Sequence, residues 1–397
     1  MDLLRKNMFL DENRFLVYFN KEQINHLTHI LLNDNHLIRL ESIVNQNEIK
    51  GTSLFDSFSD LQMIYYFIHQ KTHDDESKNR KEQTKREYLR DLLQFYTYLQ
   101  AAILNEQHEQ LNINEKTSFF KLAAKRHIRS YQRWLAEEVK VNGRIGYKPA
   151  TRSRKNSVVK LFLTWLYDVD YINYPLAAAF FKSTVRDREK PDRYLSLEEV
   201  QQLLTYYKDH PINHAILITL FTTGLRIQEI AKAKWKDVYI DSSVQEGTWY
   251  MKVIGKGGKE RHARLMKPTV ESILRMRKRR GLSTKLDPND ETPVFTTNKG
   301  KPYDYKYMSE YVTKIIQKTN FDWLKEKEGP VTPHWARHFF VNHSVIDLGI
   351  PIEVVQRTVG HSDKRITEGY LKDYIDKKND ASWQWDESNF FKKNLNS

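Results

Sequence analysis

Four short segments in the second half of the sequence hold side chains that can bind an anion or transfer a proton. In the first, Gly224 ends an apolar run and Arg226 opens a new amphipathic stretch. This order places a guanidinium beside the free N–H groups of a helix start, an arrangement suited to a phosphate. The alternative is an ordinary ion pair on a helix surface between Arg226 and Glu229, three residues apart.

The second segment is a glycine-rich turn that carries cations. Gly255-Lys256-Gly257-Gly258-Lys259 separates two short stretches, 249–254 and 260–265, which predicts a β-hairpin. A lysine on such a turn could reach into a nucleic-acid groove and donate a proton to a leaving oxygen. Alternatively, Lys256, Lys259 and Arg261 are solvated cations that only improve solubility.

The third segment is Thr332-Pro333-His334-Trp335-Ala336-Arg337-His338. Thr332 as N-cap and Pro333 as first helical residue would place His334 and Arg337 one turn apart on the same face. The pair would then present an imidazole and a bidentate donor to one anion. The alternative is a histidine satisfied by a backbone carbonyl. A metal site is not expected, because the histidines here lack a carboxylate at ligand spacing.

The fourth segment is Val359-Gly360-His361-Ser362-Asp363, a polar, loop-like stretch followed by Tyr370 and Tyr374. A phenol presented after such a loop can act as a nucleophile. Packing is the alternative, since the chain has 22 tyrosines.

Helical periodicity predicts the elements that must position these groups. Apolar residues recur at helical spacing in 21–32, 57–69, 84–99, 118–138 and 155–167. Capping boxes at Thr84 with Glu87 and at Ser196 with Glu199 predict two helix starts. The charged stretches 73–86 and 182–192 predict connections. The fold class expected is mainly α with a small antiparallel β component.

Hydroxyls and cations crowd the start of the helix predicted over 155–167. Such a helix start can accept phosphate oxygens, although an ordinary solvated start has the same composition. The candidate DNA-binding residues there are Lys148, Thr151, Arg152, Arg154 and Lys155.

Composition narrows the class of protein. The chain has 397 residues, 64 Lys and Arg against 51 Asp and Glu, a formal net charge of +13 and no cysteine. The missing cysteine excludes disulfide scaffolds, zinc fingers and thiol enzymes. No run approaches the length of a bilayer span, and residues 1–19 lack a secretory signal, so a cytoplasmic location is expected. The positive charge makes nucleic acid the first candidate partner.

The order of these segments resembles the tyrosine recombinase (phage integrase) family over residues 80–374. The similarity is greatest to mobile-element integrases and chromosome-dimer resolvases. It rests on five motifs in the family's order: Tyr194-Leu195-Ser196-x-Glu198-Glu199-Val200, Thr223-Gly224-Leu225-Arg226-Ile227-x-Glu229, Gly255-Lys256-Gly257-x-Lys259-Glu260-Arg261, His334-x-x-Arg337-His338-x-Phe340 and Gly360-His361-Ser362, with Tyr370 nine residues past His361.

The resemblance implies phosphoryl transfer without a metal or nucleotide cofactor. Tyr370 would attack the scissile phosphate to leave a 3′-phosphotyrosine, with Tyr374 as the alternative in a shifted register. Arg226 and Arg337 would clamp the non-bridging oxygens, and His361 would add a hydrogen bond. Lys256 would protonate the leaving oxygen, with Lys259 as the fallback. His334 would assist proton transfer or positioning, Glu229 would orient a catalytic neighbour, and Lys259 and Arg261 would also contact DNA.

The resemblance also implies an organisation and a set of partners. Expected are a helical extension over 1–75, a helical core-binding (SAM-like) domain over 80–181, a linker over 182–193, a mixed α/β catalytic domain over 194–374 and a tail over 375–397 that docks on a neighbouring protomer. The extension would bind accessory DNA sites or contact protein.

The partners expected are double-stranded DNA with specific recombination sites, three further copies of the chain in a tetramer, and a directionality factor or a host DNA-bending protein. The function expected is site-specific recombination that integrates or excises a mobile element. The alternatives are a type IB topoisomerase-like enzyme and a catalytically inactive DNA-binding regulator.

Overall fold

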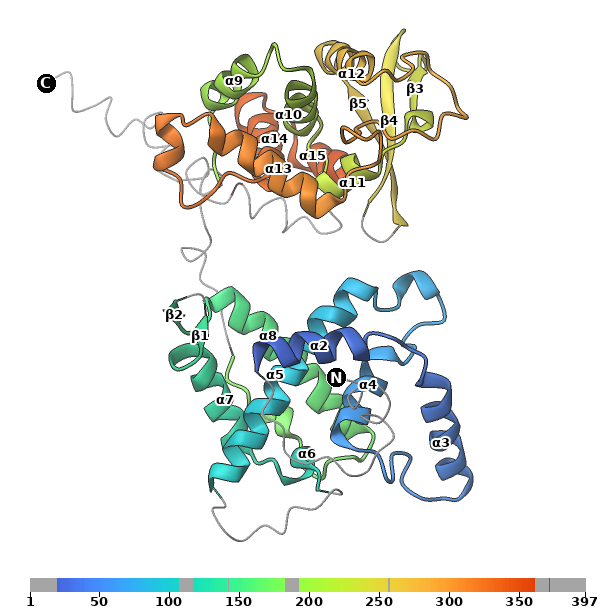
Figure 1. Cartoon of the computed structure of the whole chain (residues 1–397), viewed down its shortest axis with the longest axis vertical. Coiled ribbons are helices and arrows are strands. Elements are labelled where there is room, and N and C mark those ends of the chain that lie inside the picture. The colour runs from blue at the N-terminus through green and yellow to red at the C-terminus, as the bar shows by residue number, and fades with distance from the viewer. Residues whose placement is uncertain are drawn as a thin grey trace, which may run out of the picture. The chain divides into compact units, whose positions relative to one another are not determined.

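The computed structural model describes residues 20–106, 117–141, 143–182, 193–255, 258–360 and 371. The chain divides into two compact units, Met1–Lys190 and Pro191–Ser397 (Figure 1). Each unit has a hydrophobic core of its own. Among the described residues, no helix is both long enough and apolar enough to cross a membrane.

The first unit is helical apart from one short hairpin. Its helices are α2 (Lys21–Leu31), α3 (Leu37–Ile49), α4 (Asp60–His69), α5 (Glu82–Glu106), α6 (Phe119–Leu122), α7 (Lys125–Glu137) and α8 (Pro149–Asp168). Strands β1 (Lys140–Val141) and β2 (Arg144–Ile145) pair antiparallel. Phe67 of α4 contacts Phe162 and Trp165 of α8 at ring-centroid distances of 5.1 and 5.3 Å. Helices from the expected 1–75 extension therefore pack into the same core as the helices of 80–181.

Three helix boundaries in this unit differ from those predicted. The stretch 118–138 forms two helices that are separated at Ala123 and Ala124, both in extended backbone. Helix α8 begins at Pro149, because proline suits the first helical position, and not at residue 155. Thr84 lies inside α5 and is not its N-cap, since the backbone N–H of Lys85 already donates to the carbonyl of Lys81.

A buried carboxylate joins three segments of the first unit. Asp60, at the start of α4, accepts hydrogen bonds from the Ser118 hydroxyl at 2.5 Å, the Tyr171 hydroxyl at 3.1 Å and the backbone N–H of Phe119 at 2.7 Å. Burial raises the pKa of Asp60 to about 6, although these donors act to lower it.

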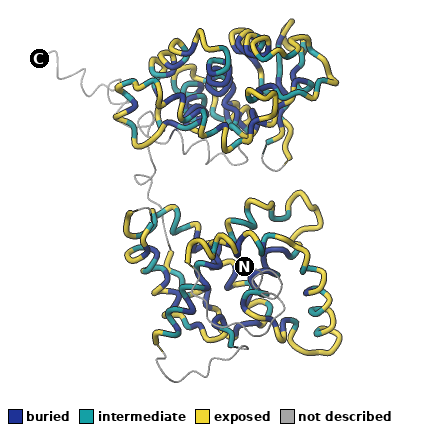
Figure 2. Tube along the Cα trace, in the orientation of Figure 1, coloured by how far each residue is buried: buried dark blue, intermediate teal, exposed yellow. Residues whose placement is uncertain are grey.

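The second unit places a small sheet beside a group of helices. The helices are α9 (Leu197–Tyr206), α10 (Pro211–Thr223), α11 (Ile227–Lys232), α12 (Lys267–Arg279), α13 (Tyr305–Lys318), α14 (Pro333–Asn342) and α15 (Ile352–Val359). Helix α10 is apolar and buried along most of its length, and it contacts α12, α13 and α14 (Figure 2). The capping box of Ser196 and Glu199 is confirmed at the start of α9.

The sheet of the second unit has the order β3 (Val238–Asp241), β4 (Thr248–Ile254), β5 (Glu260–Leu265), all antiparallel. Ile254 pairs with Glu260 next to the turn and Trp249 pairs with Leu265 at the far end. The predicted hairpin is therefore confirmed. A mainly α fold with small antiparallel sheets, as the sequence predicted, is also confirmed.

A small separate cluster forms at the end of the described chain. A π-helical turn, His343–Asp347, leads from α14 towards α15. Val341 of α14 packs with Val355 and Val359 of α15, and Leu371 is buried in the same cluster.

We expect replacement of Asp60 by Asn to destabilise the chain by about 1–3 kcal/mol. The amide has one oxygen in place of two, so some of the groups that donate to Asp60 would lose their acceptor and face an N–H group instead. The folded pKa of Asp60 lies above its ordinary value, so the folded state binds the proton more tightly than the unfolded state. The free energy that Asp60 contributes should thus fall as the pH rises from about 4 to 6. Urea unfolding of the parent and the variant across this range measures the difference. An equal change in the exposed control Asp56→Asn would contradict the prediction.

Candidate active site

Gly224 forms the turn between α10 and α11 that leads into the site. Helix α10 ends there in the left-handed conformation, with a φ of 60°. A Cβ atom on Gly224 would lie 2.6 Å from Cδ1 of Phe340, so α14 also approaches too closely for a side chain. The Thr223 hydroxyl donates to the carbonyl of Thr219 at 2.6 Å and accepts from the N–H of Leu225 at 3.3 Å. This turn places Arg226 at the N-cap of α11.

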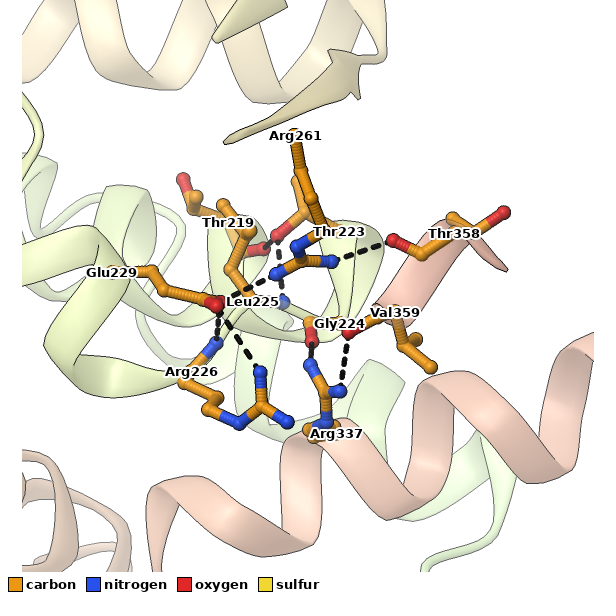
Figure 3. Close-up of polar contacts among 10 residues, drawn as sticks. All are labelled: Thr219, Thr223, Gly224, Leu225, Arg226, Glu229, Arg261, Arg337, Thr358 and Val359. Atoms are coloured by element: carbon orange, nitrogen blue, oxygen red, sulfur yellow. Dashed lines mark hydrogen bonds and ion pairs between the residues drawn. The ribbon is translucent and has the colours of Figure 1, made fainter. Parts of the chain in front are cut away.

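A single buried carboxylate, that of Glu229, holds two arginines (Figure 3). Its oxygens accept from the backbone N–H of Arg226 at 2.7 Å, from Nη1 of Arg226 at 3.2 Å and from Nη2 of Arg261 at 2.6 Å. Only 3% of the Glu229 side chain is exposed, against 35% for Arg226. The helix-start ion pair is therefore present, and it leaves part of the Arg226 guanidinium in contact with solvent.

Arg337 connects the ends of two helices. It lies on α14 and is almost fully buried. Its Nη1 donates to the carbonyl of Gly224 at 2.6 Å, and its Nη2 donates to the carbonyl of Val359 at 2.5 Å. The guanidinium thus joins the end of α10 to the end of α15 (Figure 3).

His334 is the second residue of α14, after Pro333, as the sequence predicted. The residue is exposed, yet desolvation of the imidazole and the positive charges of Arg193, Arg337 and Arg226 lower its pKa to about 4. The ring is therefore neutral at physiological pH. Its edge-to-face neighbour is His338, with 4.8 Å between ring centroids. A neutral imidazole has one nitrogen that donates a hydrogen bond and one that accepts.

Arg261 occupies a different position from the DNA contact predicted for it. Its Nη2 is bonded to Glu229, and its Nη1 donates to the carbonyl of Thr358 on α15 at 2.6 Å. Only 12% of its side chain is exposed. In this structure the Arg261 guanidinium is therefore bonded within the site, and its contact with DNA stays a prediction. Lys259, in contrast, is exposed next to the same turn.

The basic start of α8 lies in the first unit and contains one further exception. Lys155 is buried, and its ammonium donates to Asp91 and Gln94, both at 2.7 Å. It is a structural cation and not a phosphate contact. Arg154 also pairs with Asp91, at 2.5 Å, with 45% of its side chain exposed. Lys148 is exposed and Thr151 and Arg152 are partly exposed, as a binding surface requires.

Lys256, His361, Tyr370 and Tyr374 lie outside the described residues. The residues that flank three of them are described. Gly255 precedes Lys256, and a Cβ on it would lie 3.3 Å from Oε1 of Glu229. Gly360 precedes His361 and ends α15 in the left-handed conformation. Leu371 follows Tyr370 and is buried against α14 and α15.

The structure brings Arg226, Glu229, His334 and Arg337 into one site, together with two residues whose place the sequence did not indicate. Arg193 is close enough to lower the pKa of His334, but it lies in a charged stretch that is typical of a linker. Arg261 fills the space between Glu229 and α15. In the sequence, only the position of Arg261 next to the glycine-rich turn indicated that it could belong to the site.

Comparisons with known proteins show what this chain is similar to. Residues 193–376 match the model of the phage integrase family. The tyrosine recombinase XerD of Rickettsia bellii is 25% identical over 289 residues, which cover 71% of this chain and 86% of the relative. The tyrosine recombinase XerA of Pyrococcus furiosus is 26% identical over 303 residues, which cover 71% of this chain and 95% of the relative.

Two solved structures share the fold. One is the XerH site-specific recombinase bound to a palindromic difH substrate in a post-cleavage complex, with a TM-score of 0.56 and 16% identity over 89% of this chain and 94% of that one. The other is the Tn1549 transposon integrase (residues 82–397) with circular intermediate DNA, with a TM-score of 0.52 and 17% identity over 79% and 95%. The family model and the named relatives define the class of protein as a tyrosine recombinase, an enzyme of site-specific DNA recombination. Residues 193–376 form a phage integrase domain, and the chain is similar to tyrosine recombinases over about 71% of its length.

We expect Gly224→Ala to destabilise the chain more than Gly300→Ala. Both glycines have positive φ, which costs an alanine roughly 1–2 kcal/mol. Only Gly224 faces a ring, and the resulting overpacking adds about 1–3 kcal/mol. Urea unfolding of the two variants measures the difference, and equal losses would show that Phe340 does not restrict this turn.

We also expect His334 to titrate near pH 4 in an NMR titration, well below the ordinary value of 6.5. Arg193→Gln should raise this pKa, because it removes one of the three positive charges. Adding inorganic phosphate should raise it too if an anion binds beside the ring. The His334→Gln variant identifies the resonance. A His334 pKa that does not respond to Arg193→Gln would contradict the electrostatic explanation.

Proposed function

We propose that this tyrosine recombinase cleaves DNA through Tyr370, conserves the bond as a 3′-phosphotyrosine and uses the reaction to integrate or excise a mobile element. The observation that carries the proposal is the cluster of Arg226, His334 and Arg337 at the starts of α11 and α14. Glu229 is buried and already paired, so its negative charge does not repel a phosphate from the exposed part of Arg226.

The proposed reaction needs one bond exchange at phosphorus. The Tyr370 oxygen forms a bond to phosphorus while the bond from phosphorus to the 5′ oxygen breaks. The phenolic proton passes to the neutral imidazole of His334, and the Lys256 ammonium gives a proton to the 5′ oxygen. Rejoining is the reverse reaction with a new 5′-hydroxyl. The energy of the phosphodiester is retained throughout, so no nucleotide is consumed.

Arg226 and Arg337 would stabilise the charge that develops on the non-bridging oxygens, with His361 donating a further hydrogen bond. Glu229 supports this role, because its fixed carboxylate holds the Arg226 guanidinium in one orientation. Preorganisation of this kind lowers the barrier, since the donors need not reorient during the reaction.

Use by a mobile element is the finer part of the proposal. The match to XerD of Rickettsia bellii covers only 71% of this chain, so a substantial part of the chain lies beyond it. The Tn1549 transposon integrase, whose structure shares the fold, was solved in complex with circular intermediate DNA. Resolution of chromosome dimers, a topoisomerase-like activity and inactive DNA binding are the competing functions.

Assembly and DNA contacts complete the proposal. Lambda integrase, which shares the fold at a TM-score of 0.50 and 15% identity, has been solved as a tetramer on a Holliday junction. We infer a tetramer on two recombination sites for this chain, with the 375–397 tail docked on a neighbouring protomer and with a directionality factor or DNA-bending protein as accessory. Phosphate contacts would come from Lys148, Thr151, Arg152, Arg154 and Lys259.

Covalent trapping tests the nucleophile and the target together. The full chain is expressed in its native host as the parent, Tyr370→Phe and Tyr374→Phe. DNA–protein adducts are recovered under denaturing conditions without divalent metal, and the attached DNA is sequenced. We expect adducts at one or two sites from the parent and from Tyr374→Phe, and none from Tyr370→Phe.

The other outcomes are equally informative. Loss of adducts only in Tyr374→Phe would move the nucleophile by four residues. Scattered adducts would favour a topoisomerase-like enzyme, and adducts only at the chromosome's dimer-resolution site would replace the mobile-element function. No adducts from any version, with DNA binding intact, would indicate a regulator without catalysis.

A further inference from the structure

Arg261, in the second strand of the glycine-rich hairpin, is bonded to two other parts of the active site. Its backbone pairs with Val253 in the β4–β5 ladder. Its guanidinium donates to the buried carboxylate of Glu229 on one side and to the carbonyl of Thr358, the penultimate residue of α15, on the other. Strand β5, helix α11 and helix α15 therefore meet at one group (Figure 3).

The two glycines that flank the undescribed catalytic candidates both contact this group. A Cβ on Gly360 would lie 2.6 Å from Cδ of Arg261, and a Cβ on Gly255 would lie 3.9 Å from its Nε. Gly255 directly precedes Lys256, and Gly360 directly precedes His361. The Arg261 side chain thus lies against Gly255 and Gly360, the residues that directly precede the two catalytic candidates Lys256 and His361.

We propose that Arg261 is a positioning residue for the leaving-group proton donor. By bonding Glu229 and Thr358 at once, it fixes the hairpin end that carries Lys256 relative to the Arg226 site and to the segment that carries His361. The inference rests on the proposed function, because it takes Lys256 as the general acid. It assigns Arg261 no contact with DNA.

Arginine suits this role better than lysine. Its planar guanidinium directs Nη1 and Nη2 to two acceptors in different directions, whereas a lysine ammonium on a flexible stem holds one geometry poorly. Little of the Arg261 side chain is exposed, so its ion pair with the buried Glu229 depends less on salt than a surface pair does.

The test compares two DNA substrates that carry the recombination site found by adduct sequencing. One has the natural 5′ oxygen at the scissile phosphate, and the other has sulfur in its place. A thiolate leaves without being protonated, so the sulfur substrate does not need a general acid. The full-length parent, Arg261→Gln and Arg261→Lys are assayed at saturating protein, and DNA affinity is measured separately.

We expect Arg261→Gln to cleave the oxygen substrate about 100-fold or more slowly than the parent, the usual size of a general-acid contribution. On the sulfur substrate it should remain within about threefold of the parent, because the proton is no longer needed. Arg261→Lys should give an intermediate defect with the same selectivity. The ratio of the two rates does not depend on how much of each variant is folded, so partial misfolding cannot produce this result.

Arg264→Gln is the matched control. Arg264 lies on the same strand, is exposed, and donates to Gln245 at 3.3 Å, outside the active site. It removes the same charge and should leave both rates near those of the parent.

Several results would overturn the inference. Equal losses on both substrates would indicate that Arg261 acts through the arginines or through the fold. Normal cleavage combined with weak DNA binding would indicate that Arg261 contacts DNA. Normal cleavage and normal DNA binding together would show that Arg261 has no role in the reaction. Failure of the proposed function is distinguishable, because the parent itself would then form no adduct or cleave the sulfur substrate no better than Tyr370→Phe.

Discussion

The active site of this recombinase depends on one buried carboxylate. Glu229 neutralises and orients two arginines that come from opposite directions, one from its own helix start and one from strand β5. A buried carboxylate without such partners would be costly, and two guanidinium groups close together without it would repel each other. The geometry of Arg226, the position of the hairpin and the end of α15 are therefore linked through a single residue.

The second organising feature is the use of helix ends. Helices α10 and α15 both end in left-handed glycines, and Arg337 binds a carbonyl at each end. Arg226 is the N-cap of α11, and His334 is the second residue of α14. The free N–H groups at these two helix starts add positive potential to that of the arginine side chains in the site. Desolvation of the imidazole, and after it the positive charges of Arg193, Arg337 and Arg226, lower the pKa of His334.

Sequence patterns predicted the elements better than the contacts. The hairpin, the Ser196 cap and the start of α14 follow from local rules for turns and helix ends, and the structure has them as predicted. The predicted helix start at Thr84 was wrong because the helix already begins before that residue. The single helix predicted over 118–138 was wrong because the extended backbone at Ala123 and Ala124 divides it. Lys155 and Arg261 were assigned to DNA because composition cannot reveal that Asp91 or Glu229, distant in sequence, lies opposite them in the fold.

The almost complete burial of Arg337 has a consequence for genetics. Its two terminal nitrogens support backbone carbonyls at Gly224 and Val359, so removing the side chain leaves buried acceptors unpaired as well as altering the reaction site. The inactivity of an Arg337 variant could therefore come from loss of the fold or from loss of catalysis. A variant of Arg226, whose side chain is partly exposed, distinguishes the two effects better.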